Sequence, residues 1–202
     1  GNRYLNNEII AETKKHKLDL IYTNNIEKKI AELLAQGKVI AHFNNEMEFG
    51  PRSLGNRSIL CSALDKNVND WLNKKLKRTE FMPFAPVILE DKAKDYLKIK
   101  KLADYKFMTI TCNCKKKMLK QAPAAVHIDN TARPQVVNRT SNLRLALILE
   151  NFYKITGTPI LINTSFNMHE EPIVCSPNDA IRGFIDGKLD YLVLNNFLFK
   201  KK

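Results

Sequence analysis

Apolar residues recur along the chain at two spacings, one typical of helices and the other of short buried strands. Between residues 26 and 34 they repeat every three to four positions and stop before Gly37, which predicts a helix that ends near that glycine. The segment that follows, residues 38–43 (KVIAHF), has the length and composition of a buried strand. The sequence therefore predicts a helix followed directly by a strand.

The same order returns downstream. Helices are predicted around residues 5–16, 68–72, 91–97, 143–155 and 176–186. Strands are predicted at residues 87–89, 107–111, 159–163 and 191–194. This alternation indicates an α/β fold with a mixed sheet covered by helices. We expect residues 1–25 to form a helical lead-in and residues 26–202 to form the globular domain.

The composition of the chain narrows the classes of protein to which it can belong. The chain has 202 residues, of which 44% are hydrophobic and 27% charged, enough for one domain with its own core. No apolar stretch approaches the roughly 18 residues that span a bilayer, and the first twenty residues do not resemble a signal peptide. We expect a cytoplasmic protein without a membrane partner. The four cysteines are too few and too scattered for a disulfide framework.

The net charge of +12 predicts affinity for polyanions such as nucleotides, phosphorylated metabolites or nucleic acid. Most of the excess is lysine in polar runs, which usually form a solvated surface. Several arginines instead lie in segments punctuated by glycine and proline, where structured loops are expected.

One such segment, residues 48–58 (EFGPRSLGNRS), carries Arg52 and Arg57. Its glycines and proline disfavour a regular helix or central strand, so a structured loop is predicted. Guanidinium groups and free backbone N–H groups on one loop can bind phosphate oxygens. The alternative is that one arginine, Arg57 as readily as not, is buried against Glu46 or Glu48 and holds the loop in place.

Two further basic residues, Lys77 and Arg78, are expected at the end of a helix and before the stiff segment PFAP. They can serve as a positioned pair of ligands for phosphate. Their alternative role is to complement the negative end of the helix dipole.

Residues 124–137 (AAVHIDNTARPQVV) gather polar side chains between apolar flanks, among them His127, Asp129, Thr131 and Arg133. Such clusters often line a cleft. His127 and Asp129 would share one face of a strand, but two ligands are too few for a metal site. We expect no metal site and a histidine that is satisfied by a hydrogen bond.

Polar residues also follow the strand predicted at 159–163. Asn163, Thr164 and Ser165 stand where an open α/β sheet usually binds its ligand. They can hydrogen-bond a ribose, a base or a carbamoyl amide. Turn formation is the alternative role of all three.

Four blocks, in order, resemble the C-terminal domain of the carbamoyltransferase family that modifies nodulation factors, cephamycins and aminoglycosides. They are EFGPRSLGNRSIL, H-x-D-x-TAR-x-QVV, P-I-L-x-NTSFN and EPIVCSP-x-DA, within a match from about residue 26 to residue 199. The resemblance implies a YrdC/Sua5-like fold. It also implies a domain that binds ATP and carbamoyl phosphate, with Mg²⁺ accompanying the nucleotide, and forms carbamoyladenylate.

The resemblance, added to the arguments from the residues themselves, implies candidate roles. We expect catalytic contacts from Arg52, Lys77 and Arg133. Nucleotide-binding contacts are expected from Arg57, Arg78, Asn163, Thr164 and Ser165.

The chain departs from the family in two places. Met82 stands where family members commonly have an arginine before PFAP, and Asn130 replaces a usual glycine. The first change removes one expected phosphate contact. The family's Kae1-like N-terminal domain, which binds a metal ion and transfers the carbamoyl group, is implied as a partner and is not part of this sequence.

Two rival functions remain. One is a basic RNA-binding domain without catalysis, although few aromatic residues accompany the lysine runs for base stacking, so nucleic acid is not the expected partner. The other is an inactive docking domain that lost activity with the change at Met82.

Overall fold

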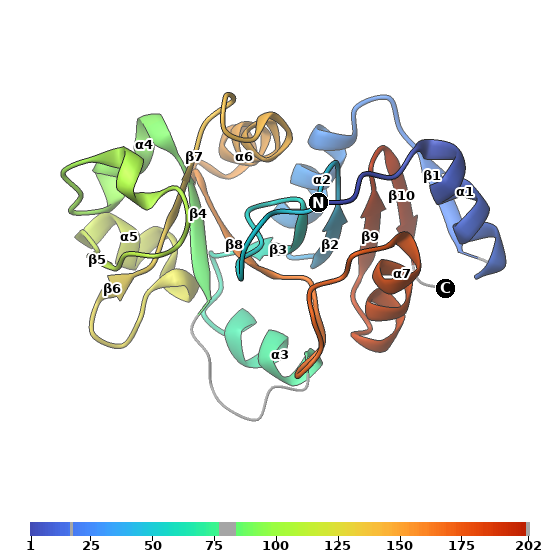
Figure 1. The fold of residues 1–202 in the computed structure, drawn as a ribbon. Helices are drawn as coiled ribbons and strands as arrows, with labels where there is room; N and C mark the ends of the chain where they lie inside the picture. The colour runs from blue at the N-terminus through green and yellow to red at the C-terminus, as the bar shows by residue number, and fades with distance from the viewer. Residues whose placement is uncertain (17, 77–83, 201–202) are drawn as a thin grey trace.

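The computed structural model describes residues 1–16, 18–76 and 84–200. Its centre is an eight-stranded mixed sheet in the order β1-β10-β9-β2-β3-β8-β4-β7 (Figure 1). The strands are β1 (Asp19–Tyr22), β2 (Ile40–Phe43), β3 (Arg57–Ser62), β4 (Ala85–Leu89), β7 (Gln135–Val137), β8 (Ile160–Ser165), β9 (Tyr191–Leu194) and β10 (Phe197–Lys200). A separate two-stranded sheet pairs β5 (Cys112–Asn113) with β6 (Thr131–Ala132).

The helices follow the expected pattern except for α5 (Lys116–Gln121), which was not predicted. They are α1 (Asn6–Lys15), α2 (Ile26–Ala35), α3 (Val68–Lys75), α4 (Glu90–Tyr96), α5 (Lys116–Gln121), α6 (Leu143–Thr156) and α7 (Pro177–Asp186), with short 3-10 turns at Leu102–Tyr105 and Pro123–Ala125. Gly157 ends α6 in the left-handed region, at φ 73°, where glycine carries no steric penalty. Ser176 begins α7 with a capping box that involves Asp179.

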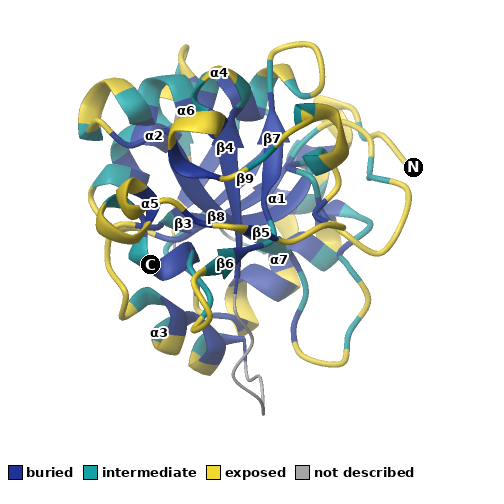
Figure 2. Cartoon of the chain, turned by 90° about the vertical axis from the view of Figure 1, so that its left-hand side faces the viewer, coloured by how far each residue is buried: buried dark blue, intermediate teal, exposed yellow. Residues whose placement is uncertain are grey.

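Helices cover both faces of the sheet. On one face α2 and α6 lie side by side (Figure 1) and pack against apolar residues such as Leu60, Leu161 and Val193. The other face carries a larger cluster that includes Ile59, Ile162 and residues of α7. The central strands are therefore buried, whereas the outer helix surfaces are exposed (Figure 2). This arrangement confirms the predicted mixed sheet covered by helices.

The sequence pattern missed several strands. β3 begins at Arg57, inside the segment predicted to be a loop, and lies between β2 and β8. β1, β7 and β10 were also not predicted, and β1 brings residues of the expected lead-in to the sheet edge through pairing with β10. The strand predicted at residues 107–111 is wrong, because this segment forms bends followed by irregular chain, and Met108 has a φ of 54°.

Candidate functional site

A pocket of about 240 Å³ lies beside the carboxyl end of β8, and we call it the arginine pocket. It brings together segments that are far apart in the sequence. Its lining includes Arg52, Ser53, Phe84, Arg133, Asn163, Thr164, Ser165 and Asn167. Five candidate residues from the sequence analysis thus share one cavity. They come from the loop before β3, the loop before β7, and the end of β8.

The two arginines of this pocket are close enough to affect each other. The pKa of Arg133 is lowered mainly by burial and additionally by the positive charge of Arg52. Among the described residues, neither guanidinium forms an ion pair or a hydrogen bond. Glu170 also lines the pocket; its carboxylate lies 3.9 Å from His169 and forms no ion pair with either arginine. Two cations that share a pocket without such an ion pair favour a bound anion, which would relieve their repulsion.

Asn163 forms the floor of the pocket and is almost fully buried. Its amide nitrogen donates to Gln135 Oε1 over 2.7 Å and to the Ser53 carbonyl over 3.3 Å. A carbonyl can only accept, so these contacts fix the orientation of the Asn163 amide. Its Oδ1 atom is buried without a hydrogen-bond partner in the described part of the chain, and it can accept a hydrogen bond from a ligand.

The loop from Asn44 to Asn56, which carries Arg52, has a path fixed by buried polar contacts. The Glu48 carboxylate accepts hydrogen bonds from the backbone N–H groups of Leu54 and Asn56, both over 2.6 Å. The Leu54 carbonyl accepts one from the Gln135 side chain over 2.8 Å. Hydrogen bonds from Glu48, within the loop, and from Gln135, on β7, therefore fix its conformation, and the predicted structured loop is present.

Gly55 lets this loop approach α6 closely. Its φ is 122°, and a Cβ atom at this position would lie 2.7 Å from Leu145 and 2.9 Å from Asn142. Both the backbone conformation and the available space therefore require glycine.

Arg57 does not line the arginine pocket. Its side chain is fully buried, and its guanidinium lies 3.5 Å from the centre of the Phe43 ring. The guanidinium donates to the carbonyl groups of Asn2, Asn44, Asn45 and Asn56 over 2.9–3.2 Å. This geometry matches the alternative that the arginine holds the loop, but its partners are main-chain carbonyls and not the Glu46 or Glu48 carboxylates.

His42, on β2, lies behind the same loop and is fully buried. Its Nδ1 atom is 2.6 Å from the Gly55 carbonyl and must carry the proton of that hydrogen bond, because a carbonyl cannot donate. Its Nε2 atom has no partner among the described residues. Burial, assisted by the charges of Arg144 and Arg57, lowers the pKa of His42 to about 3.

Lys77, Arg78 and Met82 lie outside the described residues. Their expected roles in phosphate binding therefore stay predictions. The neighbouring residue Phe84, which is described, lines the arginine pocket.

His127 and Asp129 occupy a turn and not the strand that was expected. The Thr131 hydroxyl lies 3.0 Å from His127 Nδ1 and donates to Asp129 over 2.7 Å. The expected hydrogen bond to the histidine is thus present. Within residues 1–16, 18–76 and 84–200, no group of three or more His, Cys, Asp and Glu side chains is placed to hold a metal ion.

The sequence analysis missed Gln135 and Ser53, although both lie within the blocks quoted above. Gln135 links Asn163 to the Leu54 carbonyl, and the Ser53 hydroxyl donates to the Arg57 carbonyl. Gln135 alone carries a signal for this role, as a polar residue at the start of a buried apolar strand.

Residues 31–201 match the family model of the carbamoyltransferase C-terminus. The chain belongs to this family. An uncharacterized protein of Methanocaldococcus jannaschii is 40% identical over all of this chain and 34% of its own length. The nodulation protein NolNO of Sinorhizobium fredii is 38% identical over 89% of this chain and 27% of its own length. This carbamoyltransferase C-terminal domain therefore spans about a third or less of these relatives.

Solved structures support the fold of the carbamoyltransferase C-terminal domain. Full-length HypF in its phosphate- and nucleotide-bound form has a TM-score of 0.63 at 21% identity, with 85% of this chain and 25% of that chain covered. Sua5 of P. abyssi, complexed with L-threonine, has a TM-score of 0.57 at 14% identity, with 84% and 46% covered. The predicted YrdC/Sua5-like fold is confirmed. In the part of the chain that the structure describes, no helix has the length and apolar character of a membrane span.

Proposed function

We propose that this domain uses ATP to activate carbamoyl phosphate as carbamoyladenylate. A Kae1-like N-terminal domain of the longer protein would then transfer the carbamoyl group to an acceptor hydroxyl. In this proposal residues 1–25 are the lead-in from that domain, and residues 26–202 are the activating domain. The observation that carries the proposal is the pair of guanidinium groups, Arg52 and Arg133, that share one pocket with Asn163 and form no ion pair with a described residue. The solved HypF that shares the fold is phosphate- and nucleotide-bound.

The chemistry has two steps in this proposal. Water releases inorganic phosphate from carbamoyl phosphate and leaves carbamate. A carbamate oxygen then attacks the α-phosphate of ATP, and pyrophosphate leaves. Arg52 and Arg133 would reduce the repulsion between the two anions and stabilise charge on the transferring phosphate, and Lys77 and Arg78 are proposed to assist them.

Three polar groups at the end of β8 are proposed to orient the substrates. Asn163 Oδ1, which has no hydrogen-bond partner among the described residues, suits the NH₂ group of a carbamoyl moiety, because that NH₂ group needs a hydrogen-bond acceptor when it is buried. The side chains of Thr164 and Ser165, both half-buried at the pocket, suit ribose or phosphate oxygens. Mg²⁺ would be bound by the nucleotide phosphates, as is common for this cation.

Isothermal titration calorimetry with a non-hydrolysable carbamoyladenylate analogue tests the proposed site. A hydrogen bond to a charged group contributes about 1.5 to 3 kcal/mol, so Arg133→Ala should weaken binding about tenfold to a hundredfold. Arg139→Ala is the matched control, because Arg139 is an exposed arginine paired with Glu150. Equal affinity of wild type and Arg133→Ala would exclude the arginine pocket.

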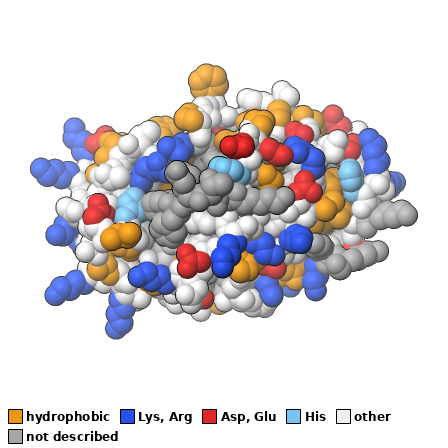
Figure 3. All heavy atoms as spheres, turned by 90° about the horizontal axis from the view of Figure 1, so that it is seen from below, with side chains coloured by type: hydrophobic (Ala, Val, Ile, Leu, Met, Phe, Trp, Pro, Cys, Tyr) orange, Lys and Arg blue, Asp and Glu red, His pale blue; other side chains and the backbone are white. Residues whose placement is uncertain are grey.

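Turnover separates this proposal from an inactive docking domain. Pyrophosphate release from ATP that depends on carbamoyl phosphate is expected for the active domain. RNA binding is the other rival, and it predicts an affinity that falls steeply with salt. On the face seen in Figure 3, Lys and Arg side chains are interspersed with acidic and uncharged groups and do not form one continuous band, which supports a small-molecule substrate.

A further inference from the structure

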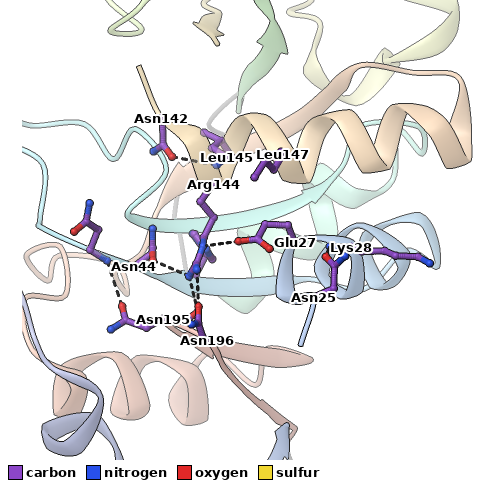
Figure 4. A network of polar contacts seen from close by, with 12 residues as sticks. Asn25, Glu27, Lys28, Asn44, Asn142, Arg144, Leu145, Leu147, Asn195 and Asn196 are labelled. Atoms are coloured by element: carbon purple, nitrogen blue, oxygen red, sulfur yellow. Dashed lines mark hydrogen bonds and ion pairs between the residues drawn. The ribbon is translucent and has the colours of Figure 1, made fainter. Parts of the chain in front are cut away.

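The Asn44–Asn56 loop also lines a second cavity, of about 560 Å³, which we call the asparagine pocket (Figure 4). It lies where the parallel strands β2 and β9 end, since Asn44 and Asn195 directly follow these strands. The first turns of α2 and α6 border it through Glu27 and Leu143. Ligands of open α/β sheets bind outside the carboxyl ends of strands, which is the position of this cavity.

Arg144 organises the polar lining. Its guanidinium donates to Glu27 Oε1 over 3.0 Å, and to the side-chain oxygens of Asn44 over 2.7 Å and Asn196 over 2.5 Å (Figure 4). A guanidinium has no acceptor, so the oxygen of each asparagine must face it. The NH₂ groups of Asn44 and Asn196 consequently point away from Arg144, and no described residue accepts a hydrogen bond from them.

Other residues that line the same cavity carry donor groups as well. The backbone N–H groups of Leu143 and Arg144 are the first two of α6, and helix geometry leaves them without an intrahelical acceptor. Arg3 also lines the cavity and forms no ion pair with a described residue. Glu27 is the one carboxylate among the described lining residues, and it is paired with Arg144. The cavity is therefore rich in donors and poor in free acceptors.

We propose that the asparagine pocket is a second ligand site, which binds the oxyanion of a small phosphate ester. Phosphate oxygens accept several hydrogen bonds at once and match the amide, backbone and guanidinium donors gathered there. The volume is within the range of small-molecule pockets and exceeds that of a phosphate alone. This site does not depend on the activation of carbamoyl phosphate in the arginine pocket.

The test is a titration followed by amide chemical shifts, with inorganic phosphate and glycerol 3-phosphate as probes and glycerol as the neutral counterpart. Both anions should shift the side-chain NH₂ signals of Asn44 and Asn196 and the backbone signals of Leu143 and Arg144, whereas glycerol should not. The shifts should persist in Arg52→Gln, because Arg52 lines the arginine pocket and does not line the asparagine pocket.

The paired variant Asn44→Asp/Asn196→Asp is the decisive comparison. Each aspartate keeps the oxygen that accepts from Arg144 but replaces the NH₂ donor with a negative oxygen, so the network is retained and the anion is repelled. We expect at least a tenfold loss of phosphate affinity. If this variant does not fold, Asn45→Asp serves instead, because no described residue contacts the Asn45 side chain through a hydrogen bond. Shifts confined to the arginine pocket, shifts that survive in the aspartate variant, or an equal response to glycerol would overturn the proposal.

Discussion

Arg52 and Arg133 lie 81 positions apart in the sequence but share one pocket, where burial and, after it, the positive charge of Arg52 lower the pKa of Arg133. No described carboxylate forms an ion pair with either side chain, and Glu170 of the same pocket is next to His169. Such an arrangement is unfavourable in the free protein and becomes favourable when an anion binds. Stability and ligand binding should therefore respond in opposite directions to the loss of one charge.

Replacement Arg52→Gln should stabilise the free domain slightly, by no more than about 0.5 kcal/mol because Arg52 is exposed. Urea denaturation measures this difference. It should disappear at about 1 M sodium chloride, where the screening length falls to about 3 Å. A destabilised Arg52→Gln protein at low salt would contradict the proposed repulsion.

Replacement Arg57→Met should destabilise the domain by about 3 kcal/mol or more. The buried guanidinium donates to four main-chain carbonyl groups, and methionine would leave them without donors inside the protein. The free energy of unfolding from urea denaturation is the measurement. Arg139→Met is the control, because its exposed ion pair contributes less than about 1 kcal/mol. Similar stabilities for the two variants would show that Arg57 does not hold the loop.

Acid should destabilise the domain partly through His42. The folded-state pKa is about 3, below the value near 6.5 of an unfolded chain. The unfolded state therefore binds more protons between these values, and stability falls as the pH decreases through this window. The slope from this residue is at most about 1.4 kcal/mol per pH unit.

The variant His42→Gln isolates this contribution, because glutamine does not titrate and its amide can still donate to the Gly55 carbonyl. Its unfolding free energy should fall less between pH 7 and pH 5 than that of the wild type, by about 2 kcal/mol. The carboxylates affect both proteins alike and cancel in the comparison. Parallel pH profiles would show that His42 is not buried in its neutral form.

Replacement Gly55→Ala should cost about 2 kcal/mol more than Gly50→Ala. Both glycines have a positive φ, of 122° and 112°, so both variants carry backbone strain. Only at Gly55 would the added methyl group meet Leu145 and Asn142, because the space around Gly50 is open. Thermal unfolding of the two variants provides the comparison, and equal melting temperatures would disagree with the close packing of the loop against α6.

Strong periodic patterns predicted the helices well, since α2, α6 and α7 bury one face and end at glycines or begin at caps. The missed strands are short or lie beside turn residues. β7 has three residues, too few for a recognisable pattern, and β3 follows directly on the glycine-containing loop and begins with the polar residues Arg57 and Ser58. Their places depend on pairing with strands far away in the sequence.

Only part of the candidate site could be predicted, because its assembly also depends on contacts between distant parts of the sequence. Chemistry-bearing residues such as Arg52 and Arg133 could be chosen from their local sequence, and the structure brings them to one cavity. The separation of Arg57 from Arg52 depends on the pairing of β3 with β2, which places Arg57 opposite Phe43 and which local composition does not reveal. The asparagine pocket was missed because its residues are scattered among several loops and have no common sequence pattern.

The guanidinium of Arg57 donates its hydrogen bonds to main-chain carbonyl groups, which every amino acid possesses. These particular bonds therefore do not require any given side chain at positions 44, 45 and 56. Other contacts do: the Asn44 and Asn56 side chains bond to Arg144 and to the Glu46 carbonyl, respectively. Asn45 has a φ of 50°, which favours asparagine. A substitution at one of these positions should therefore disturb the side-chain contacts and leave the guanidinium bonds in place.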